Sequence, residues 1–228
     1  MGKKDVNREE ELRKRFNKAI NSIVSLDVDD DKNYYDALSA KEFINLKKAL
    51  GNINNIITLK TTLAFVDKLA SYNLIEGSVV DQIKEKINSQ SANANGFDIL
   101  CEEGDFPFVA EVKCNIPVEK DKFGPAQLGG IYKDIINLSQ GKGKVDVDVT
   151  EFNKFMVFLD CDKIEAAIKN LIDTWPKYDS YYVKGLVSDQ ESLDAIWGNI
   201  EIVDLDTKQQ LEPDKIYICV VPVVAANI

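Results

Sequence analysis

Residues 97–114 read FDILCEEGDFPFVAEVKC, and the rest of the chain can be interpreted outward from this segment. Two short apolar runs flank Gly104 and Asp105, and a Gly-Asp pair between such runs is typical of a tight turn. The pattern therefore predicts a β-hairpin. With the turn centred between these two residues, the numbers of opposed residues sum to 209, so that Asp98 lies opposite Glu111.

Side chains on the predicted hairpin alternate between its two faces. One face carries only apolar or small residues and is expected to belong to the core: Phe97, Ile99, Cys101, Phe108, Ala110, Val112 and Cys114. The other face carries Asp98, Leu100, Val109, Glu111 and Lys113. Opposed Cβ atoms are about 5 Å apart, so two carboxylates there repel each other unless a cation lies between them. Lys113 or a bound Mg²⁺ would supply that positive charge.

The composition limits the chemistry that this chain can perform. Its 228 residues are 45% apolar and 29% charged, as in a soluble globular protein with one large domain or a core with a helical attachment. The absence of histidine excludes Ser-His-Asp and Cys-His hydrolases, histidine-ligated zinc hydrolases and nucleases with a histidine base. The four cysteines form no C-x-x-C pair, which argues against a zinc site. Carboxylates, lysines, hydroxyls and an oxygen-bound metal remain.

The net charge of −10 is not typical of a nucleic-acid-binding protein. Residues 1–18 contain seven basic and four acidic side chains, so a DNA-binding face would have to be local. No apolar run approaches the roughly 20 residues of a membrane span, and residues 1–18 do not resemble a secretory signal. We therefore expect a cytoplasmic protein without membrane contact.

The chain changes character near residue 90. Apolar periodicity predicts helices at 6–26, 40–50, 53–72 and 79–87, with Ser39 and Ser78 as N-caps of the second and fourth. After a polar loop at 90–96, strand-like segments are found at 97–101, 108–114, 154–160, 201–205 and 216–224, with helices at 125–138 and 163–174. We expect a helical region, residues 1–90, packed on an α/β core, residues 91–228, with a mixed sheet flanked by helices. Pro222 predicts an edge position or a bulge.

Phe97-Asp98, followed by Ala110-Glu111-Val112-Lys113, resembles the PD-(D/E)XK motif of the restriction-endonuclease-like nucleases. In that family the first aspartate and the second acidic residue bind the metal, and the lysine assists the attacking water. The resemblance assigns these roles to Asp98, Glu111 and Lys113. Phe97 stands where the motif has proline, a departure of little chemical consequence. The resemblance covers about residues 80–160 and implies a restriction-endonuclease-like α/β fold.

The resemblance also suggests two further site residues. Family members often carry a polar residue on the helix after the lysine, and Gln127 is the candidate, with an exposed structural position as the alternative. Tyr132 does not have the spacing from Gln127 that the RecB-like subgroup shows. Some members add an acidic metal ligand from the preceding helix, for which Asp81 and Glu85 are candidates. Glu85 is preferred because it is nearer to Asp98 in the sequence.

Structural explanations exist for the same residues. An acidic residue opposite E-x-K on a hairpin also forms ion pairs on solvated sheet faces. The apolar character of residues 108–114 argues against that explanation, because the charges interrupt what is predicted to be a central strand. Gly141-Lys142-Gly143-Lys144 is interpreted as a flexible loop, although its lysines could contact phosphate.

The resemblance implies an endonuclease that hydrolyses DNA phosphodiester bonds with Mg²⁺, for which Mn²⁺ can substitute. A restriction or phage-defence enzyme is the leading context, and a homodimer would provide the two sites that double-strand cleavage needs. Two alternatives stay open. One is a structure-specific, repair or RNA-directed nuclease, and the other is a catalytically silent binding module on the same fold, which the negative charge favours.

Overall fold

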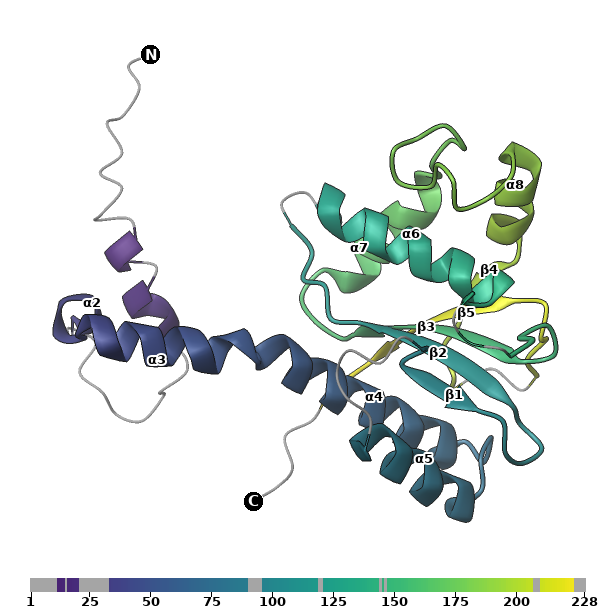
Figure 1. Ribbon diagram of the computed structural model, residues 1–228, viewed down its shortest axis with the longest axis horizontal. Coiled ribbons are helices and arrows are strands. Elements are labelled where there is room, and N and C mark those ends of the chain that lie inside the picture. The colour runs from purple at the N-terminus through teal and green to yellow at the C-terminus, as the bar shows by residue number, and fades with distance from the viewer. Residues whose placement is uncertain are drawn as a thin grey trace. The chain divides into compact units, whose positions relative to one another are not determined.

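The computed structural model describes residues 12–14, 16–20, 33–89, 96–118, 121–143, 145, 147–206 and 210–223. The chain divides into two compact units, residues 1–53 and 54–228 (Figure 1). The sequence pattern predicts a division at residue 90 instead. The difference arises because the helices that follow residue 53 pack against the sheet.

The first unit contains α2 (Tyr34–Ala37) and α3 (Ala40–Gly51), together with helical residues at 12–14 and 16–20. The remainder of the predicted helix 6–26 lies outside the described residues. Ser39 caps α3 as predicted: its Oγ accepts a hydrogen bond from the Glu42 amide, and the Glu42 carboxylate accepts one from the Ser39 amide. This reciprocal capping box satisfies amide groups that the first helical turn leaves unpaired.

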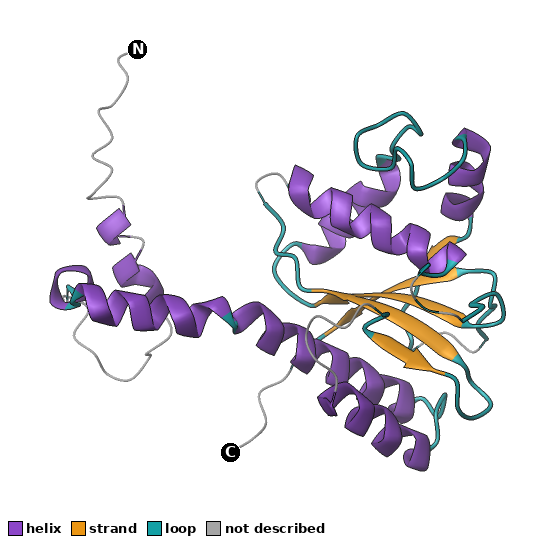
Figure 2. Ribbon diagram, viewed as in Figure 1, coloured by secondary structure: helices purple, strands orange, loops and turns teal. Residues whose placement is uncertain are grey.

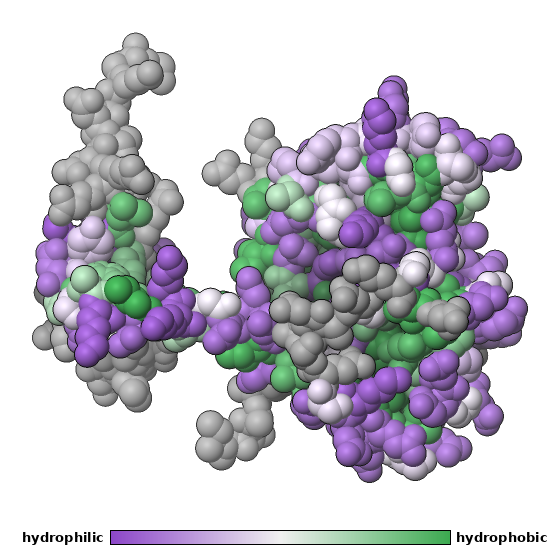
Figure 3. All heavy atoms as spheres, in the orientation of Figure 1, coloured by the Kyte–Doolittle hydropathy of each residue, from purple (hydrophilic) through white to green (hydrophobic). Residues whose placement is uncertain are grey.

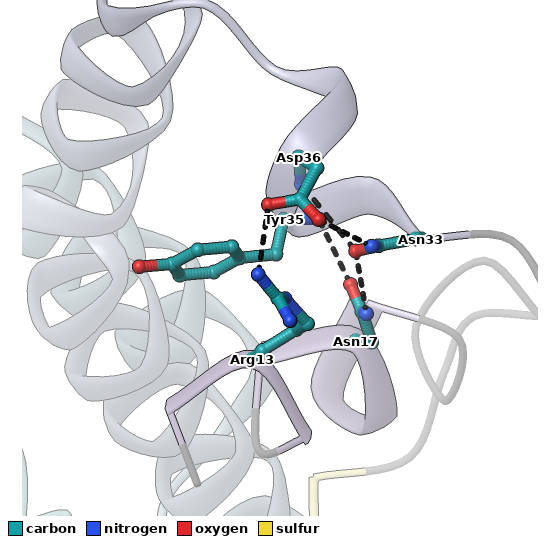
Figure 4. A network of polar contacts seen from close by, with 5 residues as sticks. All are labelled: Arg13, Asn17, Asn33, Tyr35 and Asp36. Atoms are coloured by element: carbon teal, nitrogen blue, oxygen red, sulfur yellow. Dashed lines mark hydrogen bonds and ion pairs between the residues drawn. The ribbon is translucent and has the colours of Figure 1, made fainter. Parts of the chain in front are cut away.

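Asp36 is the centre of a polar network within the first unit (Figure 4). Its carboxylate pairs with Arg13 at 3.3 Å and accepts a hydrogen bond from Asn33 at 2.6 Å. Asn17 donates to the Asn33 side chain and accepts a hydrogen bond from the Tyr35 amide. The network ties the residues around Asn17 to the start of α2, so short helices gain contacts that they could not make alone.

The second unit is built on a five-stranded sheet in the order β1-β2-β3-β5-β4. The strands are β1 (Ile99–Cys101), β2 (Phe108–Lys113), β3 (Asn153–Leu159), β4 (Ile200–Ile202) and β5 (Ile216–Val221). β1 pairs antiparallel with β2, whereas the β2–β3, β3–β5 and β4–β5 pairs are parallel. The mixed sheet is therefore confirmed. Within the hairpin, Ile99 pairs with Ala110, and Leu100 with Val109, which is the predicted register.

The last strand differs from its prediction. β5 is a central strand between β3 and β4, and it ends at Val221. Pro222 therefore follows the strand, where its missing amide hydrogen removes no ladder bond. The prediction of an edge position or a bulge was wrong, because Pro222 marks the end of a buried strand.

Helices cover both faces of the sheet (Figure 2). α4 (Ile53–Ser71) and α5 (Gly77–Ser89) pack on one face, where their apolar side chains join those of Ile99, Cys101, Phe108, Ala110 and Val112. α6 (Pro125–Gln140), α7 (Ile164–Asp173) and α8 (Gln190–Gly198) cover the opposite face, which includes Leu100 and Val109. The predicted alternation of the hairpin is thus confirmed within its strands.

Phe97 is an exception to that alternation. It belongs to the core under α6 and α7, not to the apolar face with Ile99 and Cys101. The reason is that β1 begins only at Ile99, so the alternation of an extended strand does not reach back to Phe97.

The surface of the second unit mixes hydrophilic and apolar side chains on the face seen in Figure 3. Exposed large apolar residues of this unit are Ile56, Leu59, Ile116, Val118, Tyr181 and Ile202. Some exposed apolar side chains are ordinary at a protein surface. None of the helices in the described part of the chain combines the length and apolarity that crossing a membrane requires.

Candidate functional site

Asp98 is positioned by the hairpin immediately before β1. Its Oδ2 accepts a hydrogen bond of 2.7 Å from the backbone amide of Val112 in β2. The bond holds the carboxylate against the neighbouring strand, between the positions of Glu111 and Lys113. A hydrogen bond from a backbone amide to a carboxylate is also stronger than one between neutral groups.

Glu111 is a buried acid in the middle of the sheet. It pairs in register with Met156 of β3, and only 4% of its surface is exposed. Burial, and then the negative charges of Asp134 and Asp98, raise the pKa of Glu111 to about 8, against the opposing effect of Lys142. Asp134 and Asp98 are therefore the two carboxylates whose negative charge acts on Glu111.

Lys142 supplies the positive charge at Glu111. It follows the C-terminal end of α6, and its ammonium forms an ion pair with Glu111 Oε1. The same ammonium donates a 2.8 Å hydrogen bond to the carbonyl oxygen of Gly96 and lies 4.9 Å from the centre of the Phe97 ring. A carboxylate, a carbonyl and an aromatic face all favour a cation at this point.

Lys113 and Asp134 form a second ion pair beside the first. Lys113 is the last residue of β2, and Asp134 lies in α6, which packs over the strand. Both side chains are mostly buried, with exposed fractions of 20% and 15%. Asp134 therefore fixes the orientation of the lysine that the resemblance assigns to catalysis.

The site is a cluster of five charged groups between the hairpin and α6: Asp98, Glu111, Lys113, Asp134 and Lys142. With all five ionised, three carboxylates and two ammonium groups leave one net negative charge. Protonation of Glu111 would make the cluster neutral. The small negative excess of the ionised cluster favours the arrival of a further cation.

Gln127 lies outside the charged cluster. Its Oε1 accepts a 2.7 Å hydrogen bond from the Gly124 amide, and its Nε2 donates to the Ile116 carbonyl oxygen at 3.1 Å. These contacts join the first turn of α6 to the loop that follows β2. The side chain has a structural role in the beginning of the helix.

Glu85 is not brought to the site either. It is an exposed residue of α5, the helix that packs on the face of the sheet opposite Glu111. Its neighbour Lys86 instead points to the hairpin and donates a hydrogen bond to the Leu100 carbonyl oxygen. Asp81 is exposed on the same helix. The acidic neighbour that the structure places beside Glu111 is Asp134, from the helix that follows the hairpin.

Asp134 and Lys142 were missed in the sequence, although both left a signal. Asp134 is three residues after Ile131 and four before Leu138, two buried residues of α6, so helical spacing puts it on the inner face. A charge on that face requires a partner. Lys142 was noted as a lysine that could contact phosphate, but the flanking glycines favoured a loop without a specific contact.

The oxygen atoms left over by these contacts suit a hard divalent cation. Asp98 Oδ1 and Glu111 Oε2 are engaged in no hydrogen bond or ion pair with the described residues. Across the same described residues, no group of three or more Asp, Glu or Cys side chains is arranged to hold one metal ion. A two-carboxylate site completed by water and phosphate is a common arrangement for Mg²⁺, and the residues present fit it.

Comparison with known proteins adds no relative to this description. No protein-family model, no curated protein and no solved structure matches the chain. The function of the chain is therefore inferred from the geometry of the site and from the motif.

Proposed function

We propose that the chain is a Mg²⁺-dependent endonuclease that hydrolyses phosphodiester bonds in DNA. The observation that supports this proposal is the convergence of Asp98, Glu111 and Lys113 on one face of the hairpin. Two acids and an amine in neighbouring positions are the groups that metal-assisted phosphodiester cleavage uses. The complete absence of histidine leaves few other routes to hydrolysis at neutral pH.

Each residue has a separate task in this proposal. Asp98 and Glu111 would bind the metal through their remaining carboxylate oxygens. The metal would supply Lewis acidity, activating water and neutralising charge on the phosphate. Lys113, oriented by Asp134, would hold the attacking water and compensate negative charge on the substrate. Asp134 is a positioning residue, because it acts through Lys113.

The biological setting of the proposal comes from the resemblance to restriction-endonuclease-like nucleases. A restriction or phage-defence enzyme is the setting that we favour, with a homodimer to cut both strands of DNA. The acidic chain needs a local surface for DNA, because its net charge is −10.

A catalytically silent binding module is the second candidate. The observation in its favour is that both lysines of the cluster are paired with carboxylates, with exposed fractions of 20% for Lys113 and 18% for Lys142. Such pairs can serve only to compensate buried charge. This candidate predicts that the chain cleaves no nucleic acid with Mg²⁺ or Mn²⁺.

Cleavage of supercoiled plasmid with Mg²⁺ tests the proposal. We expect the wild type to nick or linearise the plasmid and Lys113→Ala to be slower by at least about 100-fold, the effect of losing a group that assists proton transfer. Lys163→Ala is the matched control. It removes a lysine from an exposed ion pair with Asp121, neither of which is among the five groups of the cluster, so cleavage should be unchanged.

Substrate choice separates the remaining candidates. Linear duplex DNA, branched DNA, single-stranded DNA and RNA are compared with the plasmid under the same conditions. Preference for branched DNA or for RNA would favour the structure-specific or RNA-directed alternative. Equal activity of the wild type and Lys113→Ala, or inactivity of the folded wild type on every substrate, would refute the proposed mechanism.

A further inference from the structure

The position of the Lys142 ammonium is already a cation-binding position. Its nearest partners are two oxygen atoms, Glu111 Oε1 and the carbonyl oxygen of Gly96, and the Phe97 ring covers another side. Carboxylate and carbonyl oxygens are the ligands that hard divalent cations prefer. The tethered ammonium therefore occupies a space whose oxygen atoms could also hold a metal.

A metal on Glu111 would share one carboxylate with the Lys142 ammonium, which pairs with Oε1. Mg²⁺ binds carboxylate oxygens at about 2.1 Å, so a metal on Glu111 would lie a few ångströms from Lys142 Nζ. Two positive charges at that separation repel strongly in a site that solvent reaches poorly. Glu111 is 4% exposed and the Lys142 side chain 18% exposed, so little water screens them.

The backbone before Lys142 allows this residue to move. The residue lies directly after Gly141, which caps α6 and has a φ of 83°, a value that glycine adopts without strain. Movement of Lys142 does not require the helix to unwind, because the Gly141 amide keeps its own hydrogen bond to Asn137.

We propose that Lys142 is a built-in counter-ion that competes with the divalent cation for Glu111 and leaves this position when the metal binds. The inference rests on the proposed function, because it takes Glu111 as a metal ligand. It assigns the two lysines different tasks: Lys113 stays with Asp134, whereas Lys142 exchanges with the metal. In the metal-free protein, Lys142 balances the charge of an otherwise unpaired buried carboxylate.

Chemical labelling of the wild-type protein tests the exchange directly. Lysine amines are acetylated with an N-hydroxysuccinimide ester, with and without MgCl₂, and the labelling rate of each lysine is measured by peptide mass spectrometry. We expect Mg²⁺ to raise the rate at Lys142 several-fold. Lys154 is the internal control, because its ammonium donates to the carbonyl oxygens of Thr150, Phe152 and Pro213 and should stay protected. An unchanged rate at Lys142 with bound metal would overturn the inference.

Metal affinity provides the second measurement. Mn²⁺ binding is followed by electron paramagnetic resonance in the wild type, Lys142→Gln, Lys142→Arg and Lys163→Gln. Removing a charged hydrogen-bond partner that competes with the metal should tighten binding in Lys142→Gln by roughly 10- to 100-fold. Lys142→Arg keeps the cation and should not tighten binding, and Lys163→Gln controls for the change in net charge. The titrations are run at a pH of about 9, so that protons compete little for Glu111.

Mn²⁺ binding to Asp98→Asn distinguishes failure of this inference from failure of the proposed function. If Mn²⁺ binds the wild type and Asp98→Asn abolishes binding, the metal site stands. Equal affinities of the wild type and Lys142→Gln would then overturn only the competition by Lys142. If the folded wild type binds no Mn²⁺, or if Asp98→Asn binds it equally well, both proposals fail. The labelling experiment uses unmodified protein, so it decides the matter even if Lys142→Gln does not fold.

Discussion

The two faces of the β1–β2 hairpin are made by alternate residues of the same strands, yet one face is apolar and the other is charged. Toward α4 and α5 the hairpin presents Ile99, Cys101, Phe108, Ala110 and Val112, all within one apolar core. Toward α6 it presents Glu111 and Lys113, beside Asp98, with counter-charges from Asp134 and Lys142. The first face provides stability and the second concentrates charge where solvent reaches poorly.

Packing does not explain the charged face of the hairpin. Moving an ion from water into the interior costs several kcal/mol, and even a good partner repays this only in part. Apolar side chains in these positions under α6 would be compatible with the same backbone. A cluster that is unfavourable for stability and rich in metal-binding oxygens is a reasonable place to look for function.

The largest effect should come from the apolar face. Phe108→Ala removes a fully buried ring that contacts the rings of Phe65, Phe106 and Phe155. Loss of this packing should lower the free energy of unfolding by about 3–5 kcal/mol, measured by urea denaturation. A loss below about 1 kcal/mol would mean that this face does not carry the stability of the core.

Titration of Glu111 on the charged face should make the free energy of unfolding depend on pH. The pKa of Glu111 is about 8 in the folded protein against an ordinary value of 4.5. The folded state therefore binds this proton more tightly, and the associated stability is complete below about pH 4.5 and is lost as the pH rises through about 8.

Glu111→Gln removes that titration while keeping the shape of the side chain. Relative to this variant, the wild type should lose roughly 2–4 kcal/mol of unfolding free energy between about pH 5 and pH 9. Urea denaturation at several pH values measures the difference. A difference that stays constant with pH would contradict the assigned pKa. Metal-dependent cleavage by the wild type should rise over the same range, because only ionised Glu111 can bind the metal.

Replacing an ion pair by apolar residues should separate stability from activity. In the double variant Lys113→Met/Asp134→Leu, both charges of a mostly buried pair disappear together. We expect the free energy of unfolding to rise by about 1–2 kcal/mol, while Mg²⁺-dependent cleavage is lost. Thermal denaturation and the plasmid assay measure the two effects. Retained cleavage would remove Lys113 and Asp134 from the mechanism, and strong destabilisation would show that the pair is needed for packing.

The smallest effect is expected at Gln127. Gln127→Ala loses the hydrogen bonds to Gly124 and Ile116 at the start of α6. The loss should lower the unfolding free energy by about 1 kcal/mol, as for other helix caps. Cleavage under conditions where the variant is folded should be unchanged. A large loss of cleavage without a loss of stability would restore Gln127 to the site.

The hairpin could be predicted because its signals are local. Alternation of apolar residues and a Gly-Asp turn were enough to give the register of Ile99 with Ala110. The place of β5 between β3 and β4 depends instead on contacts between residues far apart in the sequence. α8 was missed because its first turn is polar and only Leu193 and Ile196 are buried in it.

The arrangement of the candidate site was also predictable only where its signals are local. The neighbouring positions of Asp98, Glu111 and Lys113 could be predicted because these residues lie on one local hairpin. Glu85 and Gln127 were chosen by position in the sequence, but the sheet separates Glu85 from Glu111, and the helix start engages Gln127. Asp134 and Lys142 become neighbours of the hairpin only when α6 packs over it, and that packing cannot be read from adjacent residues.

The division between a local acid pair and distant counter-charges also has a consequence for folding. A hairpin closes within about 1–10 μs, whereas the parallel pairing of β2 with β3 waits for the whole α6 crossover and is slower. We therefore expect Asp98 and Glu111 to approach each other before Lys142 and Asp134 have docked. We expect the repulsion between the two carboxylates to slow folding as the pH rises. Divalent salts should relieve this repulsion, so the refolding rate should depend on divalent cations even without substrate.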